Sequence, residues 1–234
     1  MNSANNPLHL NPGQMVTNVM QNLEPIRFDA APIVNANLNT GADWTTGLPV
    51  LKGRKMMLRE LVKSDALALL SMLSSEEVAK FISPPPTTPE GFEKFIQWAV
   101  RERQAGNQMT FGMVPEGFDH AVGLVQIRAI APRFSVAEWG FAVGSPFWGT
   151  GLFVASATTA VDFAFQHTDV NRLEARAVVQ NGRGNGALRK LGAVQEGVLR
   201  GSLLKDGKHL DQIMWSIVAR DWFQAKASWG GYVS

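Results

Sequence analysis

The sequence predicts an α/β fold in which helices flank a mixed β-sheet. Apolar, strand-like runs alternate along the chain with segments of helical periodicity. Several of the helical segments begin at a capping residue and end at glycine or proline. The resulting order is a strand, helices, three antiparallel strands, a long helix, a strand, a short helix and a final strand pair, which is typical of an α/β domain.

The strands are predicted from short apolar runs that are bounded by turn residues. They cover residues 55–61, 108–114, 121–129, 135–143, 172–179, 194–203 and 210–217. A turn at 205–208 joins the last two strands into a hairpin.

The helices are placed by their caps and breakers. Thr88 is the predicted N-cap of a helix that has Pro89 at its first position and ends at Gly106. Ser64 is the predicted N-cap of a helix that reaches Leu73. The other helices are predicted at 76–81, at 186–191, and from the loop after residue 151 to about 166, with Val154, Thr158, Val161 and Phe165 on one face of that long helix.

Length and composition predict one globular domain. The chain has 234 residues, of which 45% are hydrophobic and 18% are charged, which suits one full-sized core. Residues 1–45 are rich in Asn, Pro, Thr and Ala without any periodicity, so we expect a poorly ordered N-terminal arm. The domain is predicted at 46–225, with a C-terminal tail at 226–234.

Charge and cysteine content argue against several functional classes. The 22 Lys and Arg residues against 20 Asp and Glu leave a formal charge of +2, too small to indicate a nucleic-acid or membrane partner. The absence of Cys excludes disulfides, thiolate metal sites and a Cys nucleophile, and we expect no bound metal. Because the N-terminus lacks signal-peptide features and no stretch has the length of a membrane span, we expect a cytoplasmic protein.

The segment from Val143 to Val154 is the first candidate binding site. A predicted strand ends there, a loop with Gly149 and Gly151 follows, and a helix begins at once. The unpaired N–H groups at a helix start, together with the helix dipole, favour phosphate. The loop has neither the Lys of a Walker A motif nor the third Gly of a Rossmann fingerprint. The alternative is a helix start whose glycines only allow tight packing.

The segment from Asn181 to Ala193 is the second candidate. It follows a predicted strand and contains a short basic helix that Gly192 ends. The Asn181 amide offers both donors and an acceptor, so it could hold an amide-containing ligand such as pantetheine. The alternative is an ordinary loop with an Asn turn.

Short motifs in a fixed order then extend these two segments over most of the chain. They are Met57-Leu58-Arg59-Glu60-Leu61, Ala137-Glu138-Trp139-Gly140-Phe141, Phe147-Trp148-Gly149-Thr150-Gly151, Arg172-Leu173-Glu174-Ala175, the segment from Asn181 to Gly192, and Asp206-Gly207-Lys208 with Asp211. Through them, residues from about Arg54 to Trp222 resemble the GNAT N-acetyltransferases, specifically the branch with the ribosomal-protein N-terminal acetyltransferases.

The resemblance implies a mixed, mostly antiparallel sheet that is splayed at a coenzyme A site. The CoA pyrophosphate would lie on backbone amides of the loop and helix start, and the pantetheine arm would pair with the end of the preceding strand. Asn181 would bind pantetheine or an ordered water, and Leu188 would cover the adenine end. The cofactor-binding residues implied are Phe141, Ala142, Val143, Trp148, Gly149, Thr150, Gly151, Leu152, Phe153, Asn181 and Leu188.

Four positions depart from the family pattern. Trp148 stands where the family loop often has Gln or Arg, and Phe153 replaces a small residue and could narrow the pyrophosphate cradle. Gly184 replaces a common Ser, and Leu188 occupies the position of a Tyr general acid. Since the only Tyr of the chain is Tyr232, a Tyr acid at position 188 is excluded.

The chemistry that the resemblance implies is direct attack of an amine on a thioester, which needs positioning, a base and an oxyanion donor. Glu138 is the candidate base, with a structural or surface carboxylate as the alternative, and Asn181 is a further catalytic candidate through its water. A backbone N–H near Val143 would meet the oxyanion. His209 is a weaker base candidate and is more typical of a solvated turn residue.

The predicted function is therefore transfer of an acetyl group from acetyl-CoA, as co-substrate, to a primary amine. The branch points to a protein N-terminus as the acceptor. The alternatives left open are a small-molecule amine acceptor, a succinyl-CoA donor, and a non-catalytic CoA-binding protein. The resemblance is also compatible with a homodimer.

Overall fold

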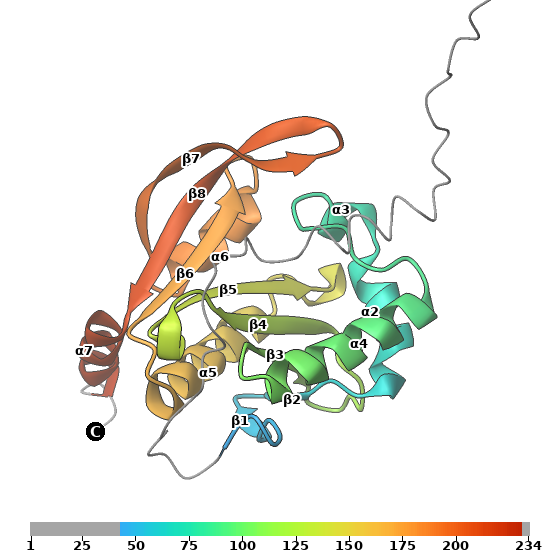
Figure 1. The fold of residues 1–234 in the computed structure, drawn as a ribbon, viewed down its shortest axis with the longest axis horizontal. Helices are drawn as coiled ribbons and strands as arrows, with labels where there is room; N and C mark the ends of the chain where they lie inside the picture. The colour runs from blue at the N-terminus through green and yellow to red at the C-terminus, as the bar shows by residue number, and fades with distance from the viewer. Residues whose placement is uncertain (1–42, 231–234) are drawn as a thin grey trace, which may run out of the picture. The chain divides into compact units, whose positions relative to one another are not determined.

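A computed structural model describes residues 43–230 (Figure 1). Within them the chain forms one mixed sheet of eight strands in the order β1-β2-β3-β4-β5-β6-β8-β7. The strands are β1 (Leu51–Gly53), β2 (Met56–Glu60), β3 (Gln108–Pro115), β4 (Gly123–Ala129), β5 (Val136–Val143), β6 (Arg172–Val178), β7 (Val194–Lys205) and β8 (Lys208–Val218). All neighbouring pairs are antiparallel except β5 and β6, which are parallel.

Helices cover both faces of this sheet. They are α2 (Ala66–Leu73), α3 (Glu76–Ala79), α4 (Pro89–Gln104), α5 (Leu152–His167), α6 (Gly182–Lys190) and α7 (Ala219–Gly230). Alternate residues of each strand point to opposite faces, so the sheet contributes to two cores. The larger core includes α5, and the smaller one includes α2 and α4 (Figure 1).

The predicted α/β class, the mixed sheet and all seven predicted strands are confirmed. The structure adds β1 and α7, which the sequence reading missed. Trp44 falls inside the predicted arm but is only 1% exposed and packs edge-on against Phe134, so the folded domain extends at least to this residue. The rest of the arm, residues 1–42, lies outside the described residues, as does Tyr232.

The cap of α4 is confirmed, whereas the face predicted for α5 is only partly right. The Thr88 hydroxyl accepts a hydrogen bond from the Gly91 N–H at 3.0 Å, with Pro89 at the first helical position. On α5, Val161 and Phe165 are buried, but Val154 is 39% exposed. The reason is that half of the buried residues of α5 are small ones that the predicted face did not include, namely Ser156, Ala157, Ala160 and Ala164.

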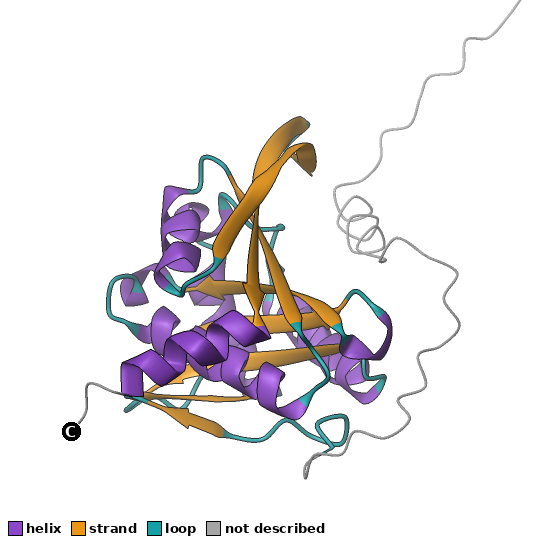
Figure 2. Cartoon of the chain, turned by 90° about the vertical axis from the view of Figure 1, so that its left-hand side faces the viewer, coloured by secondary structure: helices purple, strands orange, loops and turns teal. Residues whose placement is uncertain are grey.

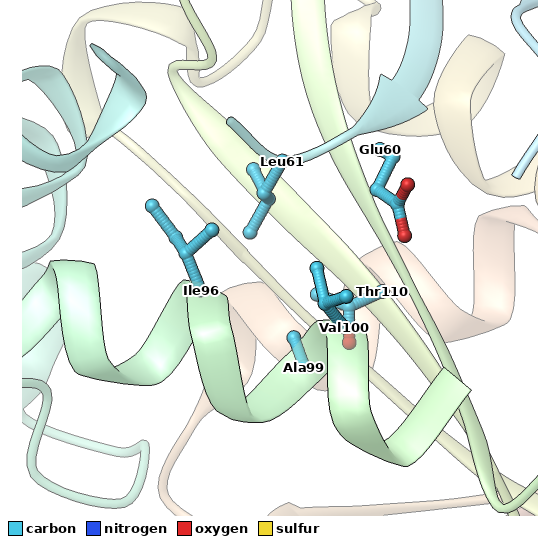
Figure 3. Close-up of a pocket in the computed structure, with 6 residues that line it drawn as sticks. All are labelled: Glu60, Leu61, Ile96, Ala99, Val100 and Thr110. Atoms are coloured by element: carbon cyan, nitrogen blue, oxygen red, sulfur yellow. The ribbon is translucent and has the colours of Figure 1, made fainter. Parts of the chain in front are cut away.

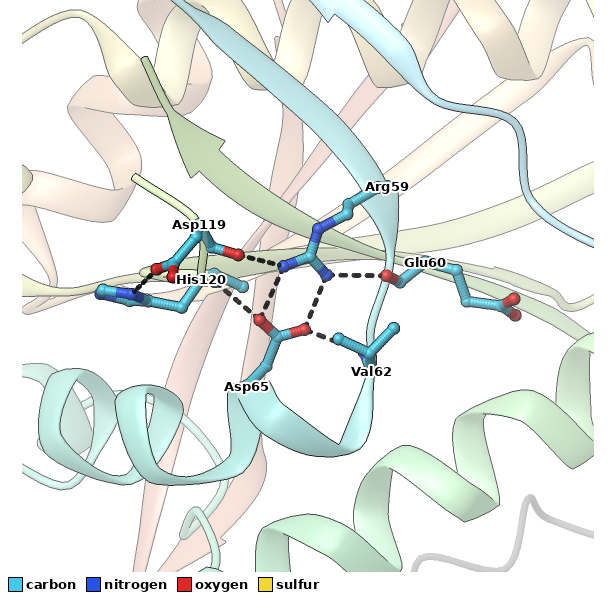
Figure 4. Close-up of polar contacts among 7 residues, drawn as sticks. Arg59, Glu60, Val62, Asp65, Asp119 and His120 are labelled. Atoms are coloured by element: carbon cyan, nitrogen blue, oxygen red, sulfur yellow. Dashed lines mark hydrogen bonds and ion pairs between the residues drawn. The ribbon is translucent and has the colours of Figure 1, made fainter. Parts of the chain in front are cut away.

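A buried ion pair fixes the start of the smaller core (Figure 4). The Asp65 carboxylate is fully buried and accepts two hydrogen bonds from Arg59, at 2.7 and 2.8 Å. It also accepts from the backbone N–H groups of Val62 and Ala121. The prediction of Ser64 as the N-cap is wrong, because α2 begins after Asp65, and the Asp65 side chain makes no capping hydrogen bond to this helix. It ties β2 to the segment before β4 instead.

The same contacts determine the acidity of this carboxyl. Burial acts to raise the pKa of Asp65, but the Arg59 guanidinium and the two backbone N–H groups outweigh it, and the pKa lies below its usual value. A lowered folded-state pKa adds stability above the unfolded-state pKa of about 3.9. This stability is lost as the pH falls through the folded-state pKa.

The β7–β8 hairpin extends well beyond the other strands and reaches α3 (Figures 1 and 2). At its tip, the Lys205 ammonium donates hydrogen bonds to the backbone carbonyls of Ala79, at 2.5 Å, and Ile82, at 2.7 Å. Burial in this contact lowers the pKa of Lys205, an effect that neighbouring Asp206 opposes. The hairpin is thereby attached to a segment more than 120 residues away in sequence.

We predict that Asp65→Asn lowers the free energy of unfolding by about 3–5 kcal/mol at pH 7, because it leaves Arg59 without its buried carboxylate. The loss is expected to shrink below about pH 4, because Asp65 is then protonated in the unfolded wild-type chain and its carboxylate contributes less to stability. Urea denaturation from pH 3 to pH 7 measures both effects.

Asp119→Asn is the matched control, because the Asp119 side chain is exposed and only its backbone carbonyl contacts Arg59. Its denaturation midpoint is expected to stay at the wild-type value. An Asp65→Asn protein as stable as the wild type at pH 7 would contradict the prediction.

Candidate active site

A gap opens between β5 and β6 in the centre of the sheet. The two strands pair only at Val136, Ala137 and Glu138, which face Arg172, Leu173 and Glu174. Beyond this point β5 continues to Val143 along β4, whereas β6 continues along β8 over seven paired positions. The two parallel strands therefore diverge towards the carboxyl end of β5.

Backbone groups of β5 point into this gap. The hydrogen bonds from Ile130 N to Val136 O and from Gly144 N to Val122 O show that even-numbered residues of β5 bond to β4. Because hydrogen-bonding direction alternates along a strand, the N–H groups of Phe141 and Val143 point towards the diverging β6. A strand edge of this kind can bind an extended ligand that contains amides.

The loop after β5 ends in an exposed helix N-terminus. Gly149 and Gly151 have φ values of 78° and 89°, which glycine adopts without strain. Gly151 is the N-cap of the 16-residue α5. Among the described residues, the N–H groups of Phe153 and Val154 have no acceptor, so this end of α5 has the partial positive charge that attracts phosphate.

Trp148 joins this loop to α6. Its indole N–H donates to the carbonyl of Val143 at 2.9 Å, and the Arg183 guanidinium lies 4.0 Å from the centre of its ring. A guanidinium over an indole face is a favourable cation–π contact. The loop thus has an arginine beside it, although its own first position carries none. The sequence reading missed Arg183, because its pairing with Trp148 is not local.

Phe153 packs against β5. Its ring lies 4.1 Å from that of Phe141, and it contacts the larger core. Phe153 is therefore held by packing with Phe141.

Asn181 is the N-cap of α6, which begins at Gly182, four residues before the predicted start of this helix. Its side-chain oxygen accepts from the Gly184 N–H at 2.8 Å, while its Nδ2 has no acceptor among the described residues. A Cβ at Gly184 would lie 2.5 Å from this Nδ2, so the glycine makes room for the cap. Leu188, predicted to cover adenine, is 1% exposed and belongs to the larger core.

Asn185, which the sequence reading did not single out, anchors α6. Its Nδ2 donates to the carbonyls of Val178 and Asn181, and its Oδ1 accepts from the Trp215 indole at 2.9 Å. The side chain is buried and joins α6 to the end of β6 and to β8. It thereby holds Asn181 and Arg183 beside the gap.

Glu138 lies where the gap opens, between two arginines. Its carboxylate accepts from Arg128 at 2.5 Å, and its other oxygen lies 3.7 Å from Nε of Arg176. The Glu138 side chain is 25% exposed, so it is accessible from the face that carries α2 and α4.

A second ion-pair group lies next to Glu138. Arg172 donates to Glu174 at 2.8 Å and to both oxygens of Glu196. This guanidinium, together with the Ser216 hydroxyl, lowers the pKa of Glu196 to about 2. Arg172 thus pairs with Glu174 and Glu196, whereas Arg176 lies nearest to Glu138.

The remaining expectations concern His209, a bound metal and a membrane span. His209, the weaker base candidate, has its Nδ1 3.1 Å from the carbonyl of Gly201. Within the described residues no three His, Cys, Asp or Glu side chains are placed to hold a metal ion. Nor does that part of the chain contain a helix long and apolar enough to cross a membrane.

Two hollows lie elsewhere in the structure. One, between α4 and the sheet, has no room for a water molecule (Figure 3). It is lined by Glu60, Leu61, Ile96, Ala99, Val100 and Thr110. The other, of about 160 Å³, lies among β7, β8 and α7. Neither hollow includes the loop after β5 or the diverging parts of β5 and β6.

Comparisons with known proteins agree with this geometry. Residues 55–194, more than half of the chain, match the acetyltransferase (GNAT) domain. N-acetyltransferase p20 of Bacillus licheniformis, an uncharacterized protein, is 25% identical over 75% of this chain and 99% of its own length.

Solved structures share the fold. Ribosomal-protein-S5-alanine acetyltransferase from Vibrio fischeri matches with a TM-score of 0.66 at 21% identity, over 74% of this chain and 98% of its own. RimL, the ribosomal L7/L12 α-N-protein acetyltransferase solved with coenzyme A, matches with a TM-score of 0.67 at 19% identity, over 73% and 98%.

The fold and the matched domain define this chain as an acetyltransferase. More specifically, it belongs to the GNAT family. The gap between β5 and β6, with its glycine loop, is accordingly its candidate active site.

We predict that Asn185→Ala lowers the free energy of unfolding by about 1–3 kcal/mol, because it leaves the buried Trp215 indole N–H without its acceptor. Urea denaturation measures this loss. Asn107→Ala is the control, since Asn107 is exposed and its side chain bonds only to Glu102; a change within about 0.5 kcal/mol is expected. Equal stability of the two variants would contradict the anchoring role.

Proposed function

We propose that this chain transfers an acetyl group from acetyl-CoA to a primary amine, and that the α-amino group of a protein is its acceptor. The observation that carries the proposal is the divergence of β5 from β6 beside a glycine loop. Together they offer an extended amide-pairing edge and a phosphate-attracting helix end, in the order in which CoA carries its pantetheine and pyrophosphate.

The residues around the gap fit acetyl-CoA. The N–H groups of Phe141 and Val143 suit the amides of the pantetheine arm, and the free Nδ2 of Asn181 offers a further donor. The N–H groups at the start of α5 suit the pyrophosphate, with Arg183 as the neighbouring cation. Leu188 is left out of this lining, because its side chain is buried.

The chemistry then needs few protein groups. Bound acetyl-CoA supplies a thioester that an amine attacks directly, so the enzyme needs no nucleophile of its own. Glu138 lies where the gap opens and is accessible, so we assign it the role of taking the proton from the ammonium of the acceptor. The Val143 N–H, directed into the gap, is the candidate donor to the developing oxyanion.

The acceptor class rests on similarity alone. The likeness to RimL and to the S5-alanine acetyltransferase, both named for ribosomal proteins, favours a protein N-terminus. A small-molecule amine, a succinyl-CoA donor and a non-catalytic CoA-binding role are the competing possibilities.

The test is thiol release from acetyl-CoA with a panel of N-terminal peptides and small amines, combined with calorimetry of acetyl-CoA binding. Turnover with peptides supports the proposal, and mass spectrometry then locates the acetyl group. Turnover with small amines alone, or faster turnover with succinyl-CoA, favours the corresponding alternative. Binding without turnover favours a CoA-binding role, and absence of binding overturns the proposed site.

We predict that Glu138→Gln lowers kcat at least 100-fold with little change in the KM for acetyl-CoA, because the amide cannot accept the proton. Steady-state kinetics of thiol release measures both constants. Glu174→Gln is the matched control, since Glu174 faces Glu138 on β6 but pairs with Arg172. We expect this variant to keep most of its activity. A kcat for Glu138→Gln equal to that of the control would remove Glu138 as the base.

We also predict that Arg183→Gln raises the KM for acetyl-CoA about 10-fold, which corresponds to about 1.4 kcal/mol. The reason is the lost cation beside the pyrophosphate. S-acetylpantetheine, which lacks the phosphates, is expected to react equally well with wild type and variant.

The control is Arg189→Gln, because Arg189 lies on the same helix and stacks on another indole, that of Trp215. Its constants for both donors are expected to match those of the wild type. An equal loss for both donors in Arg183→Gln would mean that Arg183 acts on the structure of the site and not on the pyrophosphate.

A further inference from the structure

Two arginines flank Glu138 on the face of the sheet that carries α2 and α4. Arg128 lies opposite Glu138 on β4, and Arg176 lies on β6, two residues beyond the last pairing with β5. Their side chains are 40% and 42% exposed. The two guanidinium groups therefore lie on either side of the candidate base, where the gap opens.

Arg128 and Arg176 have more hydrogen-bond donors than their protein partner can accept. Glu138 is the only carboxylate that contacts either Arg128 or Arg176 within the described residues. Each guanidinium has five N–H donors, whereas Glu138 accepts a hydrogen bond from Arg128 alone, since Arg176 stays 3.7 Å away. Although the adjacent Arg172, Glu174 and Glu196 offset the excess positive charge of this group, several of its donors have no protein acceptor.

The neighbouring ion-pair group around Arg172 differs, because its donors have protein acceptors. Arg172 is held by two carboxylates, Glu174 and Glu196, with hydrogen bonds of 2.5–2.8 Å. Its donors are used within the fold, and its side chain is only 25% exposed. A purely structural role explains Arg172, but it leaves the free donors of Arg128 and Arg176 unexplained.

We infer that the acceptor carries a carboxylate close to its amine, and that Arg128 and Arg176 bind this carboxylate while Glu138 receives the ammonium. Guanidinium groups form short, charge-assisted hydrogen bonds to carboxylates, often in pairs. An acceptor with a cationic side chain at the same place meets repulsion instead. The inference rests on the proposed function and names the substrate class of that site.

The reaction on such an acceptor balances without another reactant. The ammonium gives one proton to Glu138, and the neutral amine nitrogen forms a bond to the acetyl carbon. The carbon–sulfur bond breaks, and the CoA thiolate leaves and takes up the second proton that the attacking nitrogen loses. Glu138 then returns its own proton to solvent. Binding of the acceptor carboxylate also withdraws Arg128 from Glu138, which frees the Glu138 oxygen to accept the proton.

The carboxylate has two sources, which the test separates. It is either the side chain of an acidic residue near a peptide N-terminus or the α-carboxylate of a free amino acid. The first arm compares kcat/KM for peptides with Asp or Asn at the second position. The second arm compares free amino acids with their amides. Both arms use the full chain with saturating acetyl-CoA.

The expected result is at least a 10-fold preference of the wild type for the carboxylate member in one arm. In the double variant Arg128→Gln/Arg176→Gln this preference is expected to fall below 2-fold, while the KM for acetyl-CoA is unchanged. The double variant Arg128→Lys/Arg176→Lys is expected to keep part of the preference. Arg220→Gln, on exposed α7, is the control and should keep the whole preference.

Equal or faster turnover of the neutral members in both arms overturns the inference and leaves the proposed function intact. So does a preference that survives in the double variant. Absence of turnover with every acceptor overturns both proposals. Thermal denaturation and calorimetry of acetyl-CoA binding show whether the double variant is folded, and if it is not, the two single variants replace it in the comparison.

Discussion

The parallel pairing of β5 with β6 over only three positions is the constraint on which the site depends. Because β6 pairs with β8 over seven positions, it cannot follow β5 towards the loop. The backbone of β5 is then left free on one side where an extended ligand needs it. Asn185 adds to this constraint by fastening α6 to the end of β6, so the opening is held by buried contacts on the side away from β5.

Positive charge is concentrated at both ends of this gap in a chain whose formal charge is only +2. At the loop end of the gap, the α5 N-terminus and Arg183 form one group. At the other end, where β5 and β6 cease to pair, Arg128 and Arg176 form another. The smaller core differs, because its buried carboxylate, Asp65, is fully paired with one arginine and two backbone N–H groups. Asp65, whose carboxylate oxygens all have hydrogen-bond donors, stabilises the fold, whereas Arg128 and Arg176, which have N–H groups without acceptors, lie beside the gap.

Local rules predicted much of the fold but little of the site's surroundings. The Thr88 cap, the glycines at 149 and 151 and the strands follow from residue type and spacing, so the sequence reveals them. Burial of Trp44, by contrast, depends on a partner 90 residues away. The pairing of Arg183 with Trp148 and of Glu138 with two arginines likewise depends on strand order and register, which one sequence does not specify.

The attachment of Lys205 to α3 constrains how the hairpin can be exchanged. The hairpin tip and the α3 segment are joined, although they are far apart in the sequence, because one ammonium bonds to two carbonyls of the α3 segment. A hairpin without a lysine at position 205 would leave these carbonyls without their donor. A chimera with such a hairpin must therefore take the α3 segment from the same source.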